Sequence, residues 1–314
     1  MSLLSQGEGR WNLLRRLWTY QAERFPLGKT ALLLLVFSSA SLSLSAHLAG
    51  RPLPSPWTFV AMWLAVVLVF FQMRAADEYK DFEDDARYRP ERAIPRGLVS
   101  LRLILRLAAG TVPLIAALTV SVTPLLLLPL GLLWGWLGLM TLEFFAPRWL
   151  KSRPFLYLIS HMAIMAFIDF YVTAAEWLPH EALPPPGIWV FVVLSCVNGC
   201  VLEFGRKIWA PQNERDGVET YSALLGPQRA VRVWLAICGF AWVLLSIVGY
   251  MAGAFVVALL LGLVALVAMI AVCVNFLRNP TPKEQRRLDT AAGLWVFACY
   301  AIAGFSPFLG QVVA

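Results

Sequence analysis

Nine apolar stretches, each about 20 residues long, make up most of this 314-residue chain. They lie near residues 30–50, 57–76, 101–122, 124–146, 154–178, 187–207, 230–250, 253–277 and 290–310. A helix of about 20 apolar residues crosses the hydrocarbon core of a bilayer. Strands of a membrane barrel would instead alternate polar and apolar residues. The pattern predicts an all-α polytopic membrane protein with about nine transmembrane helices.

Composition agrees, because 59% of the residues are hydrophobic and only 14% are charged. Soluble domains carry about a quarter charged residues. Two of the boundaries between spans rest on short turn signals. Thr123 and Pro124 separate the third span from the fourth, and Gly249 and Gly253 separate the seventh from the eighth.

The distribution of Lys and Arg predicts an orientation. With nine spans and the N-terminus inside, the cytoplasmic segments are 1–29, 77–100, 147–153, 208–229 and 278–289. Of the 26 Lys and Arg residues, only Arg51 lies outside these segments and the helix ends that border them. Positive residues concentrate on the cytoplasmic side of membrane proteins. We therefore expect a cytoplasmic N-terminus and an external C-terminus, in the inner or plasma membrane if the source is bacterial. The net charge of +7 then matches anionic lipid rather than nucleic acid.

The domain organisation expected is simple. Residues 1–29 form a cytoplasmic or interfacial amphipathic segment, in which 11–25 is expected to be a helix at the membrane surface. Residues 30–314 form a single nine-helix domain. No cleavable signal peptide is evident, since the first apolar run is long enough to remain in the membrane. All five cysteines fall in predicted spans without metal-ligand spacing, which argues against a disulfide framework.

A first charged motif directly follows the second span. Asp77, Asp81 and Asp85 recur at four-residue steps, which places them on one face of a helix, one turn apart. Four arginines follow at once: Arg87, Arg89, Arg92 and Arg96. Carboxylates supply the hard oxygen ligands that Mg²⁺ prefers, and guanidinium groups bind phosphate oxygens in pairs. This combination is typical of a site for a metal–diphosphate, although a solvated network of salt bridges would show the same spacing.

A second charged motif closes the sixth span. Glu203, Arg206 and Lys207 share one helical surface, and a loop rich in polar residues follows. Spans two and six run in the same direction, four spans apart, as in two parallel repeats. We expect the two motifs to face each other across a central cavity, capped by loops 77–100 and 208–229. The same three residues would also serve as an ion cluster that only fixes topology.

The first motif resembles that of the UbiA superfamily of intramembrane prenyltransferases. That family has N-x-x-x-D-x-x-x-D, followed by a basic R-P-x-P-x-G loop. Asp77 takes the position of the family's Asn, while Asp81 and Asp85 take those of its two Asp residues. Arg92, Pro95 and Gly97 fall on the family's Arg, second Pro and Gly, and the twelve residues from Asp85 to Gly97 match the chlorophyll synthase branch. The resemblance implies nine helices with a cytoplasmic active site, over nearly the whole chain.

The second motif departs from this family. The family has D-x-x-x-D, then a Gly four residues later and another Gly nine residues after that. Gly217 and Gly226 match the two glycines, but Trp209 and Asn213 occupy the Asp positions. Arg206 and Lys207 would put positive charge where the family holds a second Mg²⁺.

The resemblance implies an Mg²⁺-dependent transferase that moves a prenyl group from an isoprenyl diphosphate to an aromatic or lipid acceptor. The catalytic residues implied are Asp77, Asp81, Asp85, Glu203 and Lys207, and the three Asp residues would hold Mg²⁺. The candidate residues for the diphosphate are Lys80, Arg89, Arg92, Arg206, Lys207, Glu214 and Tyr221. The allylic cation left by the departing diphosphate would need a cavity that excludes water.

Other functions stay open at this point. A terpene cyclase or a phosphosugar transferase would keep the first motif. A cation transporter would place acids through the membrane midplane, whereas here they cluster at one face. His161 and Asp169 lie two turns apart in the fifth span. Such a pair is a candidate functional pair in a membrane, or a hydrogen-bonded structural one.

Overall fold

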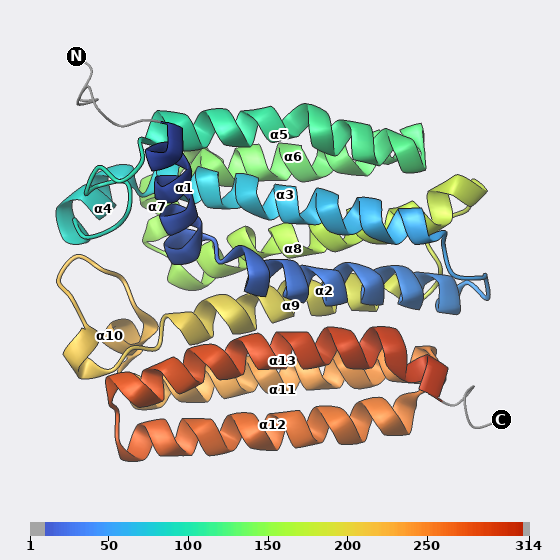
Figure 1. The fold of residues 1–314 in the computed structure, drawn as a ribbon. Helices are drawn as coiled ribbons and strands as arrows, with labels where there is room; N and C mark the ends of the chain where they lie inside the picture. Colours follow the sequence, from blue (N-terminus) through green and yellow to red (C-terminus); the bar gives the residue numbers. More distant parts are fainter. Residues whose placement is uncertain (1–9, 310–314) are drawn as a thin grey trace.

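The computed structural model describes residues 10–309, and this part of the chain is entirely helical apart from turns and loops (Figure 1). Nine helical segments within it are long and apolar enough to cross a membrane. They are α2 (Leu27–Leu48), α3 (Pro56–Lys80), α5 (Leu101–Val122), α6 with a preceding turn (Pro124–Thr141), α8 with a following turn (Pro154–His180), α9 (Ile188–Arg206), α11 (Pro227–Met251), α12 (Phe255–Arg278) and α13 (Pro282–Leu309). The prediction of an all-α protein with nine spans is confirmed.

Two helix ends differ from the sequence prediction for identifiable reasons. The fourth span stops at Thr141 rather than near residue 146, because Glu143, Phe144 and Phe145 all have positive φ and cannot continue a helix. The last helix begins at Pro282, eight residues before the apolar run. Proline is well suited to the first turn of a helix, so the polar segment after it joins the helix.

Both charged motifs lie at the same end of the bundle, on the left of Figure 1, which we call the motif end. The helix α3 leads there into the short helix α4 (Phe82–Tyr88), and α9 leads into a loop and the short helix α10 (Tyr221–Leu225). Each is followed by another long helix that runs back. The two halves therefore repeat one order of elements with the same polarity, as the sequence suggests.

An additional helix, α1 (Arg10–Arg24), packs at the motif end. Its Tyr20 is buried against a small cluster that includes Ala75 and Ile104. Its last residue, Arg24, contacts Glu78 of α3 at 2.6 Å. The helix expected at 11–25 is thus present, and it supports the first motif directly. The expected division into a segment 1–29 and a domain 30–314 stays a prediction, and residues 1–9 lie outside the described chain.

The bundle interior holds closely packed helices. The main core joins α2, α8, α9 and α13, where Phe37 and Phe191 both contact the ring of Tyr300. Gly304 of α13 is so close to Ala40 of α2 that a Cβ at Gly304 would overlap it. Small residues allow this approach, and close packing is the main force between helices in lipid.

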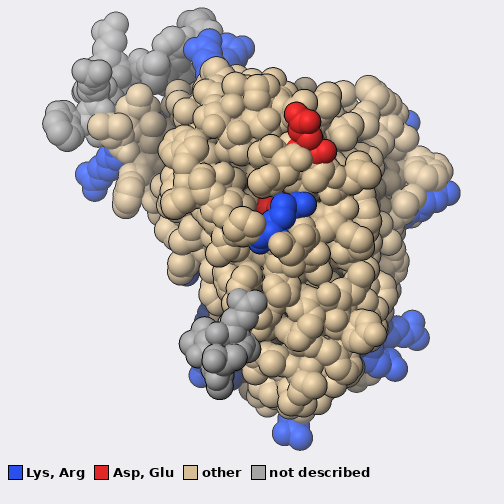
Figure 2. Space-filling view, turned by 90° about the vertical axis from the view of Figure 1, so that its right-hand side faces the viewer, with Lys and Arg blue, Asp and Glu red and all other residues tan. Residues whose placement is uncertain are grey.

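The end opposite the motif end is nearly free of charge (Figure 2). Arg51 there pairs with the buried Glu176 at 2.5 Å. This distribution supports the orientation inferred from the positive residues, which remains a proposal.

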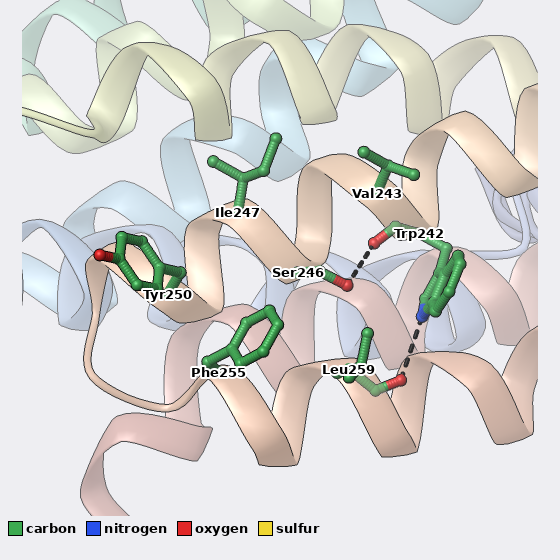
Figure 3. Close-up of a pocket in the computed structure, with 7 residues that line it drawn as sticks. All are labelled: Trp242, Val243, Ser246, Ile247, Tyr250, Phe255 and Leu259. Atoms are coloured by element: carbon green, nitrogen blue, oxygen red, sulfur yellow. Dashed lines mark hydrogen bonds between the residues drawn. The ribbon is translucent and has the colours of Figure 1, made fainter.

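A groove of about 320 Å³ lies between α11 and α12 on the outer surface (Figure 3). Its lining includes Trp242, Tyr250 and Phe255, and the last two are exposed. The indole N–H of Trp242 donates to the Leu259 carbonyl at 3.0 Å, which ties the two helices together. The groove is almost wholly apolar and lies away from both motifs, so it belongs to the lipid-facing surface.

Candidate functional site

The three aspartates of the first motif keep a one-turn spacing even though α3 ends at Lys80. The backbone N–H of Asp81 donates to the Asp77 carbonyl at 2.9 Å, and that of Asp85 donates to the Asp81 carbonyl at 2.7 Å. These bonds have the i to i−4 connectivity of an α-helix. The carboxylates therefore stand on successive turns from the end of α3 into α4, as the spacing predicts.

Asp85 is buried and surrounded by guanidinium groups. Arg92 bonds both of its carboxylate oxygens, at 2.6 and 2.9 Å, and Arg89 and Arg24 lie at 3.3 and 3.9 Å. A buried carboxylate needs such partners, because burying an unpaired charge is costly. Burial lowers the pKa of Arg92, and the hydrogen bond to Asp85 opposes that shift. Asp85 therefore gathers in one place three cations from α1 and the loop after α4.

The carboxylates of the other two aspartates have fewer hydrogen-bond and ion-pair partners. Asp77 faces Arg74 at 3.6 Å, and its side chain is 42% exposed. The carboxylate of Asp81 forms no hydrogen bond or ion pair with any residue between 10 and 309. Burial, reinforced by the negative charge of Asp85, raises the pKa of Asp81. Such a carboxylate would be stabilised by a bound cation.

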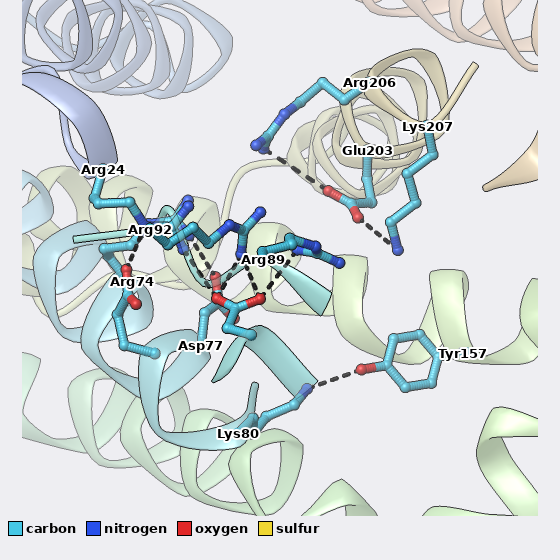
Figure 4. A network of polar contacts seen from close by, with 12 residues as sticks. Arg24, Arg74, Asp77, Lys80, Arg89, Arg92, Tyr157, Glu203, Arg206 and Lys207 are labelled. Carbon is cyan, nitrogen blue, oxygen red and sulfur yellow. Dashed lines mark hydrogen bonds and ion pairs between the residues drawn. The ribbon is translucent and has the colours of Figure 1, made fainter. Parts of the chain in front are cut away.

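Lys80 points away from the arginine cluster, toward α6 and α8 (Figure 4). Its ammonium group lies 2.9 Å from the Tyr157 hydroxyl, 3.0 Å from Nε2 of His161 and 3.1 Å from Oε1 of Glu143. An ammonium group has three donors, and all three have acceptors here. The donors of Lys80 are thus directed to a polar cluster separate from the arginines, and its role in binding diphosphate stays a prediction.

Glu143 was not predicted from the sequence, and it occupies a strained segment. It lies in η2 (Glu143–Phe145), three consecutive residues with φ of 51°, 51° and 59°. Each left-handed residue costs about 1–3 kcal/mol, and such strain is concentrated at functional sites. Packing holds it in place, since Phe144 contacts the rings of Trp136 and His161. The sequence signal available was a single acid directly after a span.

The second motif faces the first (Figure 4). Glu203 is in the last turn of α9, with Lys207 at 3.1 Å and Arg206 at 3.8 Å. Glu203 is near enough to Asp77 for the two charges to act on each other. The structure therefore brings together the two charged groups that the sequence placed four spans apart.

Glu214 and Tyr221, the two remaining predicted diphosphate residues, hold the second loop in place. The Glu214 carboxylate accepts hydrogen bonds from Thr220 at 2.8 Å and Ser222 at 2.6 Å. Tyr221 stacks on Phe204, with ring centroids 3.8 Å apart, and its backbone N–H donates to the Lys207 carbonyl. Burial and the charge of Glu203 raise the pKa of Tyr221. Their role in binding a ligand stays a prediction.

The two positions where the second motif lacks Asp have structural partners. The Asn213 amide donates to Gln285 of α13 at 2.7 Å, and the same oxygen accepts from the Ala210 backbone. The Trp209 indole donates to the Arg206 carbonyl at 3.0 Å. These residues fix the loop to α9 and α13.

The loops that follow the two motifs also touch. Arg215 contacts Glu91 at 2.5 Å, and a Cβ on Gly217 would overlap the ring of Tyr88. Hydrogen bonds from its own backbone and from Arg215 lower the pKa of Glu91. The two loops thus meet at the motif end, and their expected role in capping a cavity stays a prediction.

His161 and Asp169 lie in two separate polar groups. His161 contacts Lys80, whereas Asp169 accepts a hydrogen bond from Ser41 of α2 at 2.6 Å. The two residues do not act as a pair.

The acidic side chains at the motif end offer a limited set of ligands for a divalent cation. No group of three or more His, Cys, Asp or Glu side chains among residues 10–309 is arranged to hold a metal ion. Asp77 and Asp81 nevertheless provide accessible hard oxygens on adjacent turns, which suit Mg²⁺. Asp85 is already occupied by arginines.

Comparisons with known proteins place this fold. The model of the UbiA prenyltransferase family matches residues 34–306. The apo structure of a UbiA homolog from Aeropyrum pernix K1 superposes with a TM-score of 0.65 at 19% identity, covering 88% of this chain and 98% of that one. A digeranylgeranylglyceryl phosphate synthase gives a TM-score of 0.60 at 14% identity, covering 92% of this chain and 98% of that one.

A search of curated proteins by sequence found no match. At these identities the two structures establish the fold alone, while the family model covers most of the chain. With nine spans, two facing charged motifs and this match, the chain belongs to the UbiA prenyltransferase family.

Proposed function

We propose that this protein transfers a prenyl group from an isoprenyl diphosphate to an apolar acceptor at the motif end. The observation that carries this proposal is the facing of two clusters, with Asp77 on one side and Arg206 and Lys207 on the other (Figure 4). Asp81 follows Asp77 by one helical turn. A diphosphate requires cations on several sides, and a prenyl chain requires an apolar surface beside them. The motif end offers both.

Asp77 and Asp81 would hold Mg²⁺. Asp85 would become a third ligand once Arg89 and Arg92 move away from its carboxylate. When bound, Mg²⁺ would neutralise charge on the diphosphate and make it a better leaving group. Arg89 and Arg92 would bind the remaining phosphate oxygens, which suit their paired donors. Both already lie within 3.3 Å of the Asp85 carboxylate.

Exchange of partners at Asp85 would couple donor binding to loop order. The diphosphate would compete with Asp85 for Arg89 and Arg92, since it offers more charge and more acceptors. As the guanidinium groups turned to the phosphate, the Asp85 carboxylate would become available to a cation. Asp85 would thus hold the guanidinium groups of Arg89 and Arg92 in position until the donor binds.

The second motif would act by positive charge instead of a second metal. Lys207 and Arg206 would bind the diphosphate directly, and Glu203, 3.1 Å from Lys207, would orient them. Charge placed where the leaving group gains charge stabilises the transition state for its departure. The loops after the two motifs would then exclude water from the allylic cation.

The membrane sets the approach of the substrates. We infer a cytoplasmic motif end from the positive residues gathered there. The diphosphate would enter from the cytoplasm while the prenyl chain and the acceptor remain in the apolar part of the bundle.

The test uses purified protein in detergent with Mg²⁺, a panel of isoprenyl diphosphates, and apolar phenols and alcohols as acceptors. Release of diphosphate together with a prenylated product detected by mass spectrometry is the expected result. Release of diphosphate with a cyclised hydrocarbon would point to a cyclase. No consumption of any donor would reject the proposal.

A further inference from the structure

Glu143 is a buried acid with one free oxygen beside the proposed site. Its Oε1 contacts Lys80 at 3.1 Å and accepts a hydrogen bond from Tyr157 at 3.2 Å. Its Oε2 is buried and has no partner, and the residue as a whole is 9% exposed. A buried carboxylate oxygen without a donor is costly and calls for an explanation.

A second observation separates Glu143 from other buried acids. Glu284 in α13 also pairs one oxygen, with Arg287, and leaves the other buried without a partner. However, Glu284 lies in the ordinary first turn of a helix. Glu143 instead lies in a run of three left-handed residues, which the surrounding packing must maintain.

The neighbours of Glu143 hold it in one orientation. Lys80 uses its three donors on Tyr157, His161 and Glu143, and the Tyr157 hydroxyl donates a hydrogen bond to Glu143. Because Lys80 donates to Nε2 of His161, Nδ1 carries the ring proton and donates to the Tyr157 carbonyl at 2.9 Å. All of these groups are satisfied among themselves. The one acceptor in this cluster that has no donor is Oε2 of Glu143.

The cluster also lies next to the proposed diphosphate site. Lys80 is adjacent in sequence to Asp81, and the charges of Asp77 and Asp81 reach Tyr157. Aromatic rings border the other side, since Phe144 packs on Trp136 and Trp136 stacks on Phe167. An apolar molecule with one hydrogen-bond donor would fit this environment. An anion would be repelled by the carboxylates of Asp77, Asp81 and Glu143.

We propose that Glu143 is the general base that takes the proton from a hydroxyl-bearing acceptor, a phenol or an alcohol of an apolar molecule. This rests on the proposed function. The acceptor O–H donates to Oε2. Its oxygen then forms a bond to C1 of the prenyl group as the bond from C1 to the diphosphate oxygen breaks. The diphosphate leaves with that electron pair, and the hydroxyl proton moves to Oε2.

The test compares Glu143→Gln and Glu143→Ala with wild type, using hexylphenol and dodecanol as acceptors. Glutamine keeps the shape but is not a base, so kcat should fall about 10²- to 10⁴-fold, the usual contribution of a general base. Binding of a non-reactive farnesyl thiodiphosphate should change less than threefold. Formate should restore part of the activity of Glu143→Ala but not of Glu143→Gln, which leaves no room for it.

The matched control is Glu284→Gln, which removes a similar buried carboxylate and should keep kcat within threefold of wild type. If Glu143→Gln does not fold, wild type tested with each acceptor and its methyl ether still tests whether the reaction requires a hydroxyl proton that a base can remove. Only the hydroxyl forms should be prenylated.

The outcomes separate the two proposals. Donor consumption with an unchanged kcat in Glu143→Gln, or equal rates with methyl ethers, would overturn the role of Glu143 alone. Absence of formate rescue combined with weakened binding of the thiodiphosphate would assign Glu143 a structural role. Failure of every donor and acceptor would reject the transferase function, and the role of Glu143 with it.

Discussion

Arg215 and Glu91, 124 residues apart in the chain, lie 2.5 Å from each other and join the two loops at the motif end. One belongs to the loop after α9 and the other to the loop after α4. Both side chains are more than half exposed, so the pair contributes little to global stability. Its position makes it a contact that would break whenever the loops separate to admit a donor.

The first prediction concerns this contact. Glu91→Arg should speed proteolytic cleavage within 86–100 by about two- to fivefold, since two exposed like charges would then oppose each other. The melting temperature should stay within a degree of wild type. The exchange Glu91→Arg with Arg215→Glu should restore the wild-type rate.

Diphosphate with Mg²⁺ should slow cleavage of wild type, and identical rates with and without ligand would contradict ordering of the loop.

The second prediction concerns Gly217, which has φ of 77° and faces the Tyr88 ring. Gly217→Ala should lower activity at least tenfold, because the new methyl group would displace Tyr88 and separate the loops. Gly253→Ala is the control, since Gly253 has φ of 70° and open space around it. It should cost about 1 kcal/mol in stability from backbone strain and leave activity near wild type. Equal activities in the two variants would argue against a closed arrangement of the loops.

The third prediction separates two aspartates that the sequence treats alike. Asp81→Asn should abolish turnover without loss of stability, because the Asp81 carboxylate has no partner within the described residues. Asp85→Asn should abolish turnover and also destabilise the protein by about 3–5 kcal/mol, since it leaves Arg89 and Arg92 unpaired. Asp77→Asn should be the mildest of the three. Melting temperatures and rates of diphosphate release measure both effects, and similar stabilities for Asp81→Asn and Asp85→Asn would refute the distinction.

Much of this fold could be predicted because a membrane-spanning helix requires a long apolar segment, which is easily recognised in a sequence. The spans, the order of elements and the gathering of both motifs at one end follow from residues close together in the sequence. The one-turn spacing predicted for Asp77, Asp81 and Asp85 is present even though α3 ends between them, because backbone hydrogen bonds of the helical type continue across that end.

What could not be predicted depends on long-range contacts. The pairing of Asp85 with Arg24, 61 residues earlier, needs α1 to pack on the motif end. The only local signal at Glu143 is a single acid after a span, and its contacts with Lys80 and Tyr157 come from other helices. The direction of the Lys80 side chain, toward Tyr157 and His161, also cannot be read from its position in the sequence.

The last prediction concerns the departure from the family pattern. If Arg206 and Lys207 replace a second metal, Arg206→Gln with Lys207→Gln should raise the donor KM or lower kcat by about 10²-fold or more, because charge-assisted bonds of about 1.5–3 kcal/mol each are lost. Restoring acids at Trp209 and Asn213 should not recover activity, since both positions hold the loop in place.

The matched control for this pair is Arg278→Gln with Lys283→Gln, which removes the same charge from the same end of the bundle. Both of these side chains are exposed and lie outside the two motifs. A general effect of positive charge on insertion or on donor attraction would lower activity equally in the two double variants. A direct contact with phosphate would spare the control, because screening weakens exposed charges beyond about 10 Å. A correctly inserted Arg206→Gln, Lys207→Gln protein with normal turnover would reduce the second motif to a determinant of topology.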